Sequence, residues 1–233
     1  MLIKIYYRFV NDVVDELSQL SEIVSIVLHG SLARDDIIPG ISDIDLPFIT
    51  DNRTWRGKCL NLDFSQRMHD VFNMLRKKYP EVPVFDFRRN PPVLIISEKE
   101  ALGGYPIEHD TNAIRFIYGK KFPKRFLLSD KLHDRKALKK VIEWNLSQVS
   151  DRLVWSAIGL STTSELREFV MDMISYTFKV STILLAYKCG IMEFKKERIV
   201  KRIQKCFKDF SGIGFIKDNY DLAMDWSKAN KGL

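Results

Sequence analysis

A Gly-Ser pair and an Asp-x-Asp pair, each beside an apolar run, constrain this chain more than any other feature. Residues 23–29 are rich in branched apolar side chains and stop at Gly30 and Ser31, which is typical of a strand that ends in a tight turn. Asp43 and Asp45 open a second apolar run after a short connecting segment. Because side chains alternate along a strand, we expect the two carboxylates on one face, about 6.6 Å apart.

These residue types suit the binding of a phosphate group beside a cation. Gly30 lets the backbone approach a phosphate closely, and Ser31 adds a hydroxyl donor. Arg34 can pair with a phosphate oxygen, although it fits an exposed helix position equally well. Asp43 and Asp45 offer the oxygen ligands that Mg²⁺ prefers. Either pair alone is an ordinary turn or strand start, whereas the two together favour nucleoside triphosphate chemistry.

The spelling of residues 30–34 and 42–46, Gly-Ser-Leu-Ala-Arg and Ser-Asp-Ile-Asp-Leu, resembles the signature of the DNA polymerase β-like nucleotidyltransferase superfamily. It is most similar to small bacterial and archaeal members of the aminoglycoside nucleotidyltransferase type. The resemblance implies an enzyme that moves a nucleoside monophosphate group from a nucleoside triphosphate, with ATP as the expected donor, to a hydroxyl acceptor. Pyrophosphate is released in that reaction.

The same resemblance implies roles for individual residues. Gly30, Ser31 and Arg34 are expected at the nucleotide, and Asp43 and Asp45 are expected to bind two Mg²⁺ ions. The superfamily carries a third carboxylate on a later strand, as a metal ligand or as the general base. The best match for that third carboxylate is Asp86, and the other candidates are Glu81, Glu108 and Asp110.

The first part of the chain reads as an α+β domain over residues 1–128. Hydrophobic spacing predicts helices over residues 5–20 and 63–78. Branched and aromatic runs predict strands, at residues 23–29, 43–49, 82–88 and 93–96. This order predicts a mixed sheet flanked by helices. Pro47 stands where the superfamily usually carries an aliphatic residue, and because proline cannot donate to a strand ladder we predict a local distortion after Asp45.

The second part, residues 129–233, reads as an all-α helical bundle that would bind the acceptor substrate. Apolar residues recur at helical spacing, and they predict helices at residues 138–153, 162–190, 195–209 and 217–228. The helix order is also similar to that of the helical substrate domain of the aminoglycoside nucleotidyltransferases.

Charge is distributed unevenly between the two parts. Residues 1–128 hold 18 Lys and Arg against 17 Asp and Glu, and residues 129–233 hold 19 against 13, so the second part carries +6 of the net +7. The basic run at residues 195–208 fits a solvated helix face or, alternatively, a contact surface for RNA or another polyanion. A basic second part argues against a cationic acceptor.

Expectations about partners and cellular location follow from the composition. Three widely spaced cysteines and the lack of an apolar run of membrane length favour a cytoplasmic protein without a membrane partner. A small-molecule acceptor is favoured over RNA or protein, and a homodimer is left open. The competing hypothesis is a catalytically inactive nucleotide-binding or toxin-neutralising interaction protein of the same fold.

Overall fold

The fold is taken from a computed structural model, which describes residues 2–39, 42–57, 59–80, 82, 95–103, 105–107, 114–126, 135–136, 138–140, 142–143, 146–147, 150, 163–208 and 212–229. The chain divides into two compact units, Met1–Phe126 with Asn230–Leu233, and Leu127–Ala229. Within the described ranges, no helix combines the length and the apolar character needed to cross a membrane.

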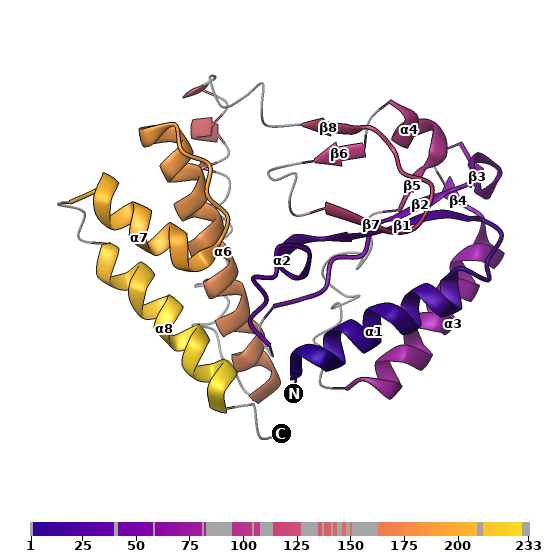
Figure 1. The fold of residues 1–233 in the computed structure, drawn as a ribbon, viewed down its shortest axis with the longest axis horizontal. Helices are drawn as coiled ribbons and strands as arrows, with labels where there is room; N and C mark the ends of the chain where they lie inside the picture. Colours follow the sequence, from indigo (N-terminus) through magenta and orange to yellow (C-terminus); the bar gives the residue numbers. More distant parts are fainter. Residues whose placement is uncertain are drawn as a thin grey trace. The chain divides into compact units, whose positions relative to one another are not determined.

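The first unit is built around a mixed four-stranded sheet with helices on both faces (Figure 1). Its helices are α1 (Leu2–Leu17), α2 (Gly30–Ala33), α3 (Leu62–Lys78) and α4 (Glu98–Leu102), with a 3₁₀ turn at Asn52–Thr54. The strands of the sheet are β1 (Ile23–His29), β2 (Phe48–Thr50), β5 (Ile95–Ser97) and β7 (Ile114–Gly119). Short pairs are formed by β3 (Trp55–Arg56) with β4 (Cys59–Leu60), and by β6 (Tyr105–Ile107) with β8 (Lys124–Phe126).

Strand β1 lies in the middle of the sheet, whose order is β5-β2-β1-β7. It runs antiparallel to β2 and to β7, whereas β2 and β5 are parallel. The sheet is therefore mixed, as predicted. The predicted strand at residues 23–29 is confirmed, and the predicted strand at residues 93–96 is represented by β5 in its described residues. The predicted strand at residues 82–88 lies outside the described residues, apart from Val82.

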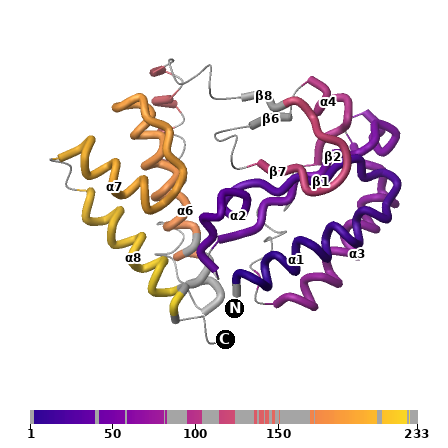
Figure 2. Tube along the Cα trace, viewed as in Figure 1, coloured from indigo at the N-terminus to yellow at the C-terminus, as the bar shows by residue number. Residues whose placement is uncertain are grey.

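The two faces of the sheet bury different side chains. Ile26, Leu28 and Phe48 pack with residues of α1 and α3 in one hydrophobic core. Figures 1 and 2 show α1 and α3 side by side on that face, where they contact each other. On the opposite face, Val27 and Ile49 pack with residues of α4 and β7. Residues next to each other in β1 thus point into different cores, which fixes the register of the strand.

The predicted second strand at residues 43–49 is wrong in its extent. A regular strand begins only at Phe48, while Asp45 pairs with His29 as an isolated bridge. The Val27 amide still donates to the carbonyl of Pro47, at 2.9 Å. Pro47 has no amide hydrogen to return, so the ladder loses a bond at this point. The proline therefore separates the Asp45 bridge from β2 and does not disrupt the register that holds Asp45.

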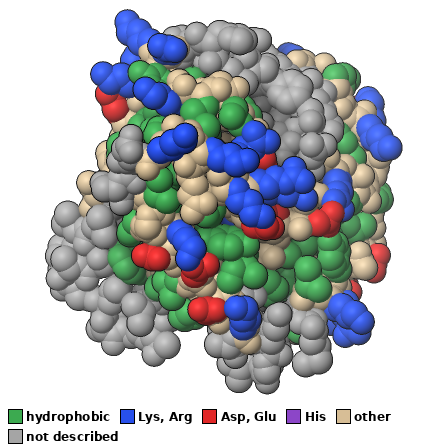
Figure 3. Space-filling view, turned by 60° about the vertical axis from the view of Figure 1, so that its left-hand side comes forward, with side chains coloured by type: hydrophobic (Ala, Val, Ile, Leu, Met, Phe, Trp, Pro, Cys, Tyr) green, Lys and Arg blue, Asp and Glu red, His purple; other side chains and the backbone are tan. Residues whose placement is uncertain are grey.

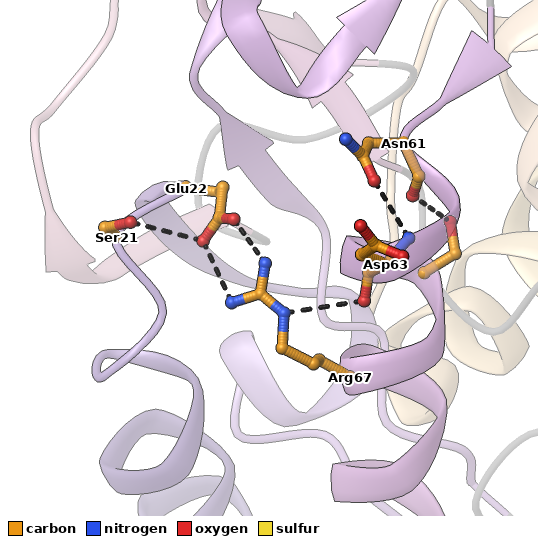
Figure 4. A network of polar contacts seen from close by, with 6 residues as sticks. Ser21, Glu22, Asn61, Asp63 and Arg67 are labelled. Atoms are coloured by element: carbon orange, nitrogen blue, oxygen red, sulfur yellow. Dashed lines mark hydrogen bonds and ion pairs between the residues drawn. The ribbon is translucent and has the colours of Figure 1, made fainter.

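A polar network fastens the start of β1 to α3 (Figure 4). Arg67 donates to the Glu22 carboxylate through its two Nη atoms and to the Asp63 carbonyl through Nε. The Asn61 side chain accepts from the Asp63 amide at 2.8 Å and caps α3. The Arg67 hydrogen bonds lower the pKa of Glu22. The network holds the end of the sheet that is opposite to the Gly30 turn.

A second polar contact joins α1 to the end of α3, and it makes stability depend on pH. Asp12 accepts hydrogen bonds from Lys78 Nζ at 2.6 Å and from Tyr79 Oη at 2.5 Å. These bonds lower the pKa of Asp12 below its ordinary value of 3.8. A carboxylate with a lowered folded-state pKa stabilises the fold above its unfolded pKa, and this contribution is lost as the pH falls through the folded-state pKa.

We expect Asp12→Asn to lower the free energy of unfolding at neutral pH by on the order of 1 kcal/mol, a small figure because Lys78 is largely exposed. The variant should also lose less stability than the wild type between about pH 5 and pH 3. Urea unfolding across that pH range measures both effects, with Asp70→Asn on the exposed side of α3 as the control. Parallel stability curves for Asp12→Asn and the wild type would contradict the prediction.

The described residues of the second unit are mainly helical. They include α6 (Thr163–Cys189), α7 (Lys196–Cys206) and α8 (Ile213–Ala229), which pack against one another in pairs. The helices predicted at residues 162–190, 195–209 and 217–228 correspond to these elements with small shifts at their ends. The helix predicted at residues 138–153 lies largely outside the described residues.

Candidate functional site

The Gly-Ser pair lies where β1 ends and the short helix α2 begins. Gly30 has a φ of +72°, in the left-handed region that favours glycine. A Cβ atom at this position would lie 2.2 Å from Oδ2 of Asp45. Glycine is therefore required twice here, once by the backbone and once by the carboxylate packed against it. The structure thus brings together Gly30 and Asp45, which the sequence had placed fifteen positions apart.

The aspartates alternate with buried apolar side chains. Ile44 and Leu46 are fully buried in the core that α1 and α3 cover. Asp45 is half-buried and Asp43 is exposed. The amide of His29 donates to the carbonyl of Asp45 at 2.9 Å, so the backbone of β1 fixes this carboxylate beside the turn. The aspartates are accessible to solvent, whereas the apolar residues that alternate with them, Ile44 and Leu46, anchor the segment in the core.

Ser31 and Arg34 follow Gly30 within α2 and at its end. Ser31 is buried, and its carbonyl accepts from the Asp36 amide at 2.9 Å. Arg34 is the C-cap of α2 and is half-buried. Its Nε atom is buried and has no hydrogen-bond partner among the described residues. A buried guanidinium donor without an acceptor is costly, so this atom marks a place where an anion would be stabilised.

The segment that joins the turn to the aspartates is held at two points. The carboxylate of Asp35 accepts from Tyr7 Oη at 2.9 Å and from Arg115 Nη2 at 2.6 Å. Asp35 has a φ of +56°, which is uncommon for a residue with a side chain. Burial raises the pKa of Tyr7, and the hydrogen bond to Asp35 raises it further. Tyr6 Oη donates to the Ser42 carbonyl at 3.2 Å, directly before Asp43.

Tyr6, Tyr7 and Arg115 were missed by reasoning from the sequence. The only signal is that two adjacent tyrosines lie near the start of a predicted amphipathic helix, where one of them must face outward. Arg115 lies on β7, which was not predicted at all. These residues hold the connecting segment and so position Asp43 and Asp45.

The predicted third carboxylate, Asp86, lies outside the described residues, as do Glu81, Glu108 and Asp110. Within the described ranges, no group of three or more His, Cys, Asp or Glu side chains gathers in a way that could hold a metal ion. Asp45 is the carboxylate that the structure packs against Gly30, and Asp43 lies two positions before it. They supply the oxygen donors that a hard cation prefers.

Comparison with known families agrees with this geometry. The family model described as a nucleotidyltransferase domain matches residues 10–207, which cover both the Gly30 turn and the aspartates. Searches of curated proteins and of solved structures find no significant match. A match that extends over most of the chain identifies the family as a whole and leaves the acceptor open. The chain belongs to the nucleotidyltransferase domain family.

Proposed function

We propose that this chain transfers a nucleoside monophosphate group from a nucleoside triphosphate, with ATP as the expected donor, to a hydroxyl acceptor. The observation that carries the proposal is the packing of Asp45 against Gly30, in a chain that belongs to the nucleotidyltransferase domain family. A turn without a side chain and a carboxylate oxygen packed against it are what a phosphate and its counter-cation need together.

The phosphate side of the site consists of Gly30, Ser31 and Arg34. Gly30 leaves room for the Asp45 carboxylate where any other residue would place a Cβ atom. Ser31 offers a hydroxyl group, and the unpartnered Nε of Arg34 offers a charge-assisted donor. In this proposal these groups hold the β- and γ-phosphates and orient the triphosphate.

The cation side consists of Asp43 and Asp45, which would hold Mg²⁺, with two ions expected. Asp86 stays the predicted third carboxylate, as a ligand or as the base that removes the proton of the acceptor. When bound, Mg²⁺ supplies Lewis-acid neutralisation of the charge on the phosphate oxygens. The protein contributes rigidity, because Ile44 and Leu46 anchor the aspartates in the core and Tyr6 fixes the residue before them.

The chemical step forms one bond and breaks one. The acceptor oxygen bonds to the α-phosphorus, the bond from that phosphorus to the bridging oxygen breaks, and pyrophosphate leaves with the electron pair. The acceptor proton goes to a base, for which Asp86 is the candidate. We assign the acceptor to the second unit, whose helices we propose form a helical substrate-binding bundle, and a small hydroxylated molecule is the favoured acceptor class.

The test is steady release of pyrophosphate by the full chain, with each nucleoside triphosphate, Mg²⁺ and a panel of hydroxylated small molecules, RNA and proteins. The reference is the double variant Asp43→Asn/Asp45→Asn. Release above that reference with any acceptor supports the proposal. Nucleotide binding by calorimetry, with no release above the reference for any acceptor, would instead indicate an inactive nucleotide-binding or toxin-neutralising protein.

Arg34→Gln should raise the KM for the nucleotide more than it lowers kcat. A hydrogen bond from a charged donor contributes about 1.5–3 kcal/mol, so we expect the KM for the nucleotide to rise roughly 10- to 100-fold. The control is Arg53→Gln, an exposed arginine that follows β2 at the other end of the sheet. An unchanged KM in Arg34→Gln would mean that Arg34 does not contact the triphosphate.

A further inference from the structure

Helix α7 presents one basic side to solvent and buries the other. Ile199, Val200 and Ile203 are buried against α6 and α8. The opposite side is defined here as the α7 basic face, which consists of five exposed residues, Arg198, Lys201, Arg202, Lys205 and Lys208. The four residues within α7, from Arg198 to Lys205, lie on one side of the helix and form a stripe along it, and Lys208 follows just after the helix ends at Cys206. Figure 3, turned toward this side of Figure 1, shows Lys and Arg side chains gathered in the upper part of the view.

Two of these five charges are already neutralised within the unit. Lys201 pairs with Glu197 at 2.5 Å, one turn before it on the same helix. Arg202 pairs at 3.1 Å with the buried Glu193, whose other oxygen accepts from the Phe194 and Lys195 amides before α7. The two contacts hold the side chains in place and leave the rest of the stripe positive.

The other three cations, Arg198, Lys205 and Lys208, form no ion pair with any residue that the structure describes. From Arg198 to Lys205 the helix rises about 10 Å. Residues 195–208 hold seven Lys and Arg and a single carboxylate, Glu197. Such a run of like charge repels itself, and a polyanion that lies along it would relieve that repulsion.

The composition of the stripe decides which polyanion fits. A stable protein partner needs apolar or aromatic anchors at the centre of the interface, and the α7 basic face has none. A membrane-binding helix needs an apolar face free to enter the lipid, but the apolar side of α7 is buried in its own unit. The phosphates of nucleic acid bind through charge alone and require neither feature.

We propose that the α7 basic face binds the sugar-phosphate backbone of nucleic acid. The contact is electrostatic and independent of base sequence, and it does not depend on nucleotidyl transfer. It gives the second unit a polyanion-binding role in addition to the proposed acceptor site.

The experiment measures binding of labelled 20-nucleotide RNA and DNA strands of mixed sequence to the full chain, by fluorescence anisotropy at several salt concentrations. We expect dissociation constants of about 10⁻⁶–10⁻⁴ M that weaken as salt is raised. The triple variant Arg198→Gln/Lys205→Gln/Lys208→Gln should weaken binding at least about tenfold at low salt. It should also reduce the slope of log affinity against log salt by about 2, because three phosphate contacts are removed.

The matched control removes three exposed lysines of the same unit that pair with carboxylates on their own helices, Lys139→Gln/Lys217→Gln/Lys228→Gln. It lowers the net charge equally and should bind nearly as well as the wild type. Thermal unfolding checks that both variants are folded. Three outcomes would each overturn the proposal. The wild type binds neither RNA nor DNA, the two triple variants lose equal affinity, or the wild type binds anionic vesicles or acidic peptides in preference to both strands. The ratio of RNA to DNA affinity identifies the strand that is bound.

Discussion

Asp45→Asn is expected to lower the rate of pyrophosphate release at least about a hundredfold, without unfolding the protein. Asparagine has nearly the same shape and keeps the contact with Gly30, so packing is preserved. It removes the negative charge that would hold Mg²⁺ beside the triphosphate. Asp43→Asn should act in the same direction, since Asp43 is also accessible and lies two positions before Asp45, on the other side of the buried Ile44 in the chain.

The control variant is Asp70→Asn, which removes an exposed carboxylate from α3 and should leave the rate of pyrophosphate release unchanged. Initial rates are measured at saturating nucleotide, together with the thermal unfolding midpoint of each variant. A rate for Asp45→Asn within a few-fold of the wild type, with the same midpoint, would remove Asp45 from the proposed cation site.

Gly30→Ala is expected to reduce both stability and activity. The alanine Cβ would lie 2.2 Å from Oδ2 of Asp45, and the backbone at φ +72° is strained for any residue other than glycine. The backbone alone costs about 1–2 kcal/mol, and the forced displacement adds about 1–3 kcal/mol. Because the atom that must move belongs to Asp45, activity should fall even at temperatures where the variant is fully folded.

Gly57→Ala separates these two effects. Gly57 has a φ of +65°, and a Cβ atom there would meet nothing within 4 Å. It should therefore show the backbone cost alone and keep full activity. Urea unfolding and pyrophosphate release of both variants give the comparison. Equal free energies of unfolding for the two variants would show that Asp45 does not restrict position 30.

The parts of the site that are close in sequence were predictable. A run rich in branched residues that ends at a Gly-Ser pair defines β1, because such a run packs well in a sheet and glycine permits the turn. Buried Ile44 and Leu46 alternate with the accessible Asp43 and Asp45, although the structure has only the Asp45 bridge in this segment and no regular strand. The distortion at Pro47 followed from its missing amide hydrogen, although its effect was to delay the regular strand until Phe48.

The parts that depend on distant pairing were not predictable. Strand β7 lies far from β1 in the chain, and nothing local shows that Arg115 pairs with Leu28. Asp35 bonds to partners 28 and 80 positions away. Its left-handed backbone is held by those partners and leaves no pattern in the neighbouring residues. Long-range register sets these contacts, and a single sequence does not reveal that register.

The two tyrosines of α1 show that the family domain and the folding unit begin at different places. The family match starts at residue 10, within α1, whereas Tyr6 and Tyr7 precede that boundary. Tyr6 is fully buried, and the hydroxyl groups of both tyrosines hold the segment that carries the aspartates. A protein shortened to the family boundary would keep every signature residue and lose the side chains that orient them. The first turns of α1 are thus part of the structure that holds the aspartates, although the family match does not include them.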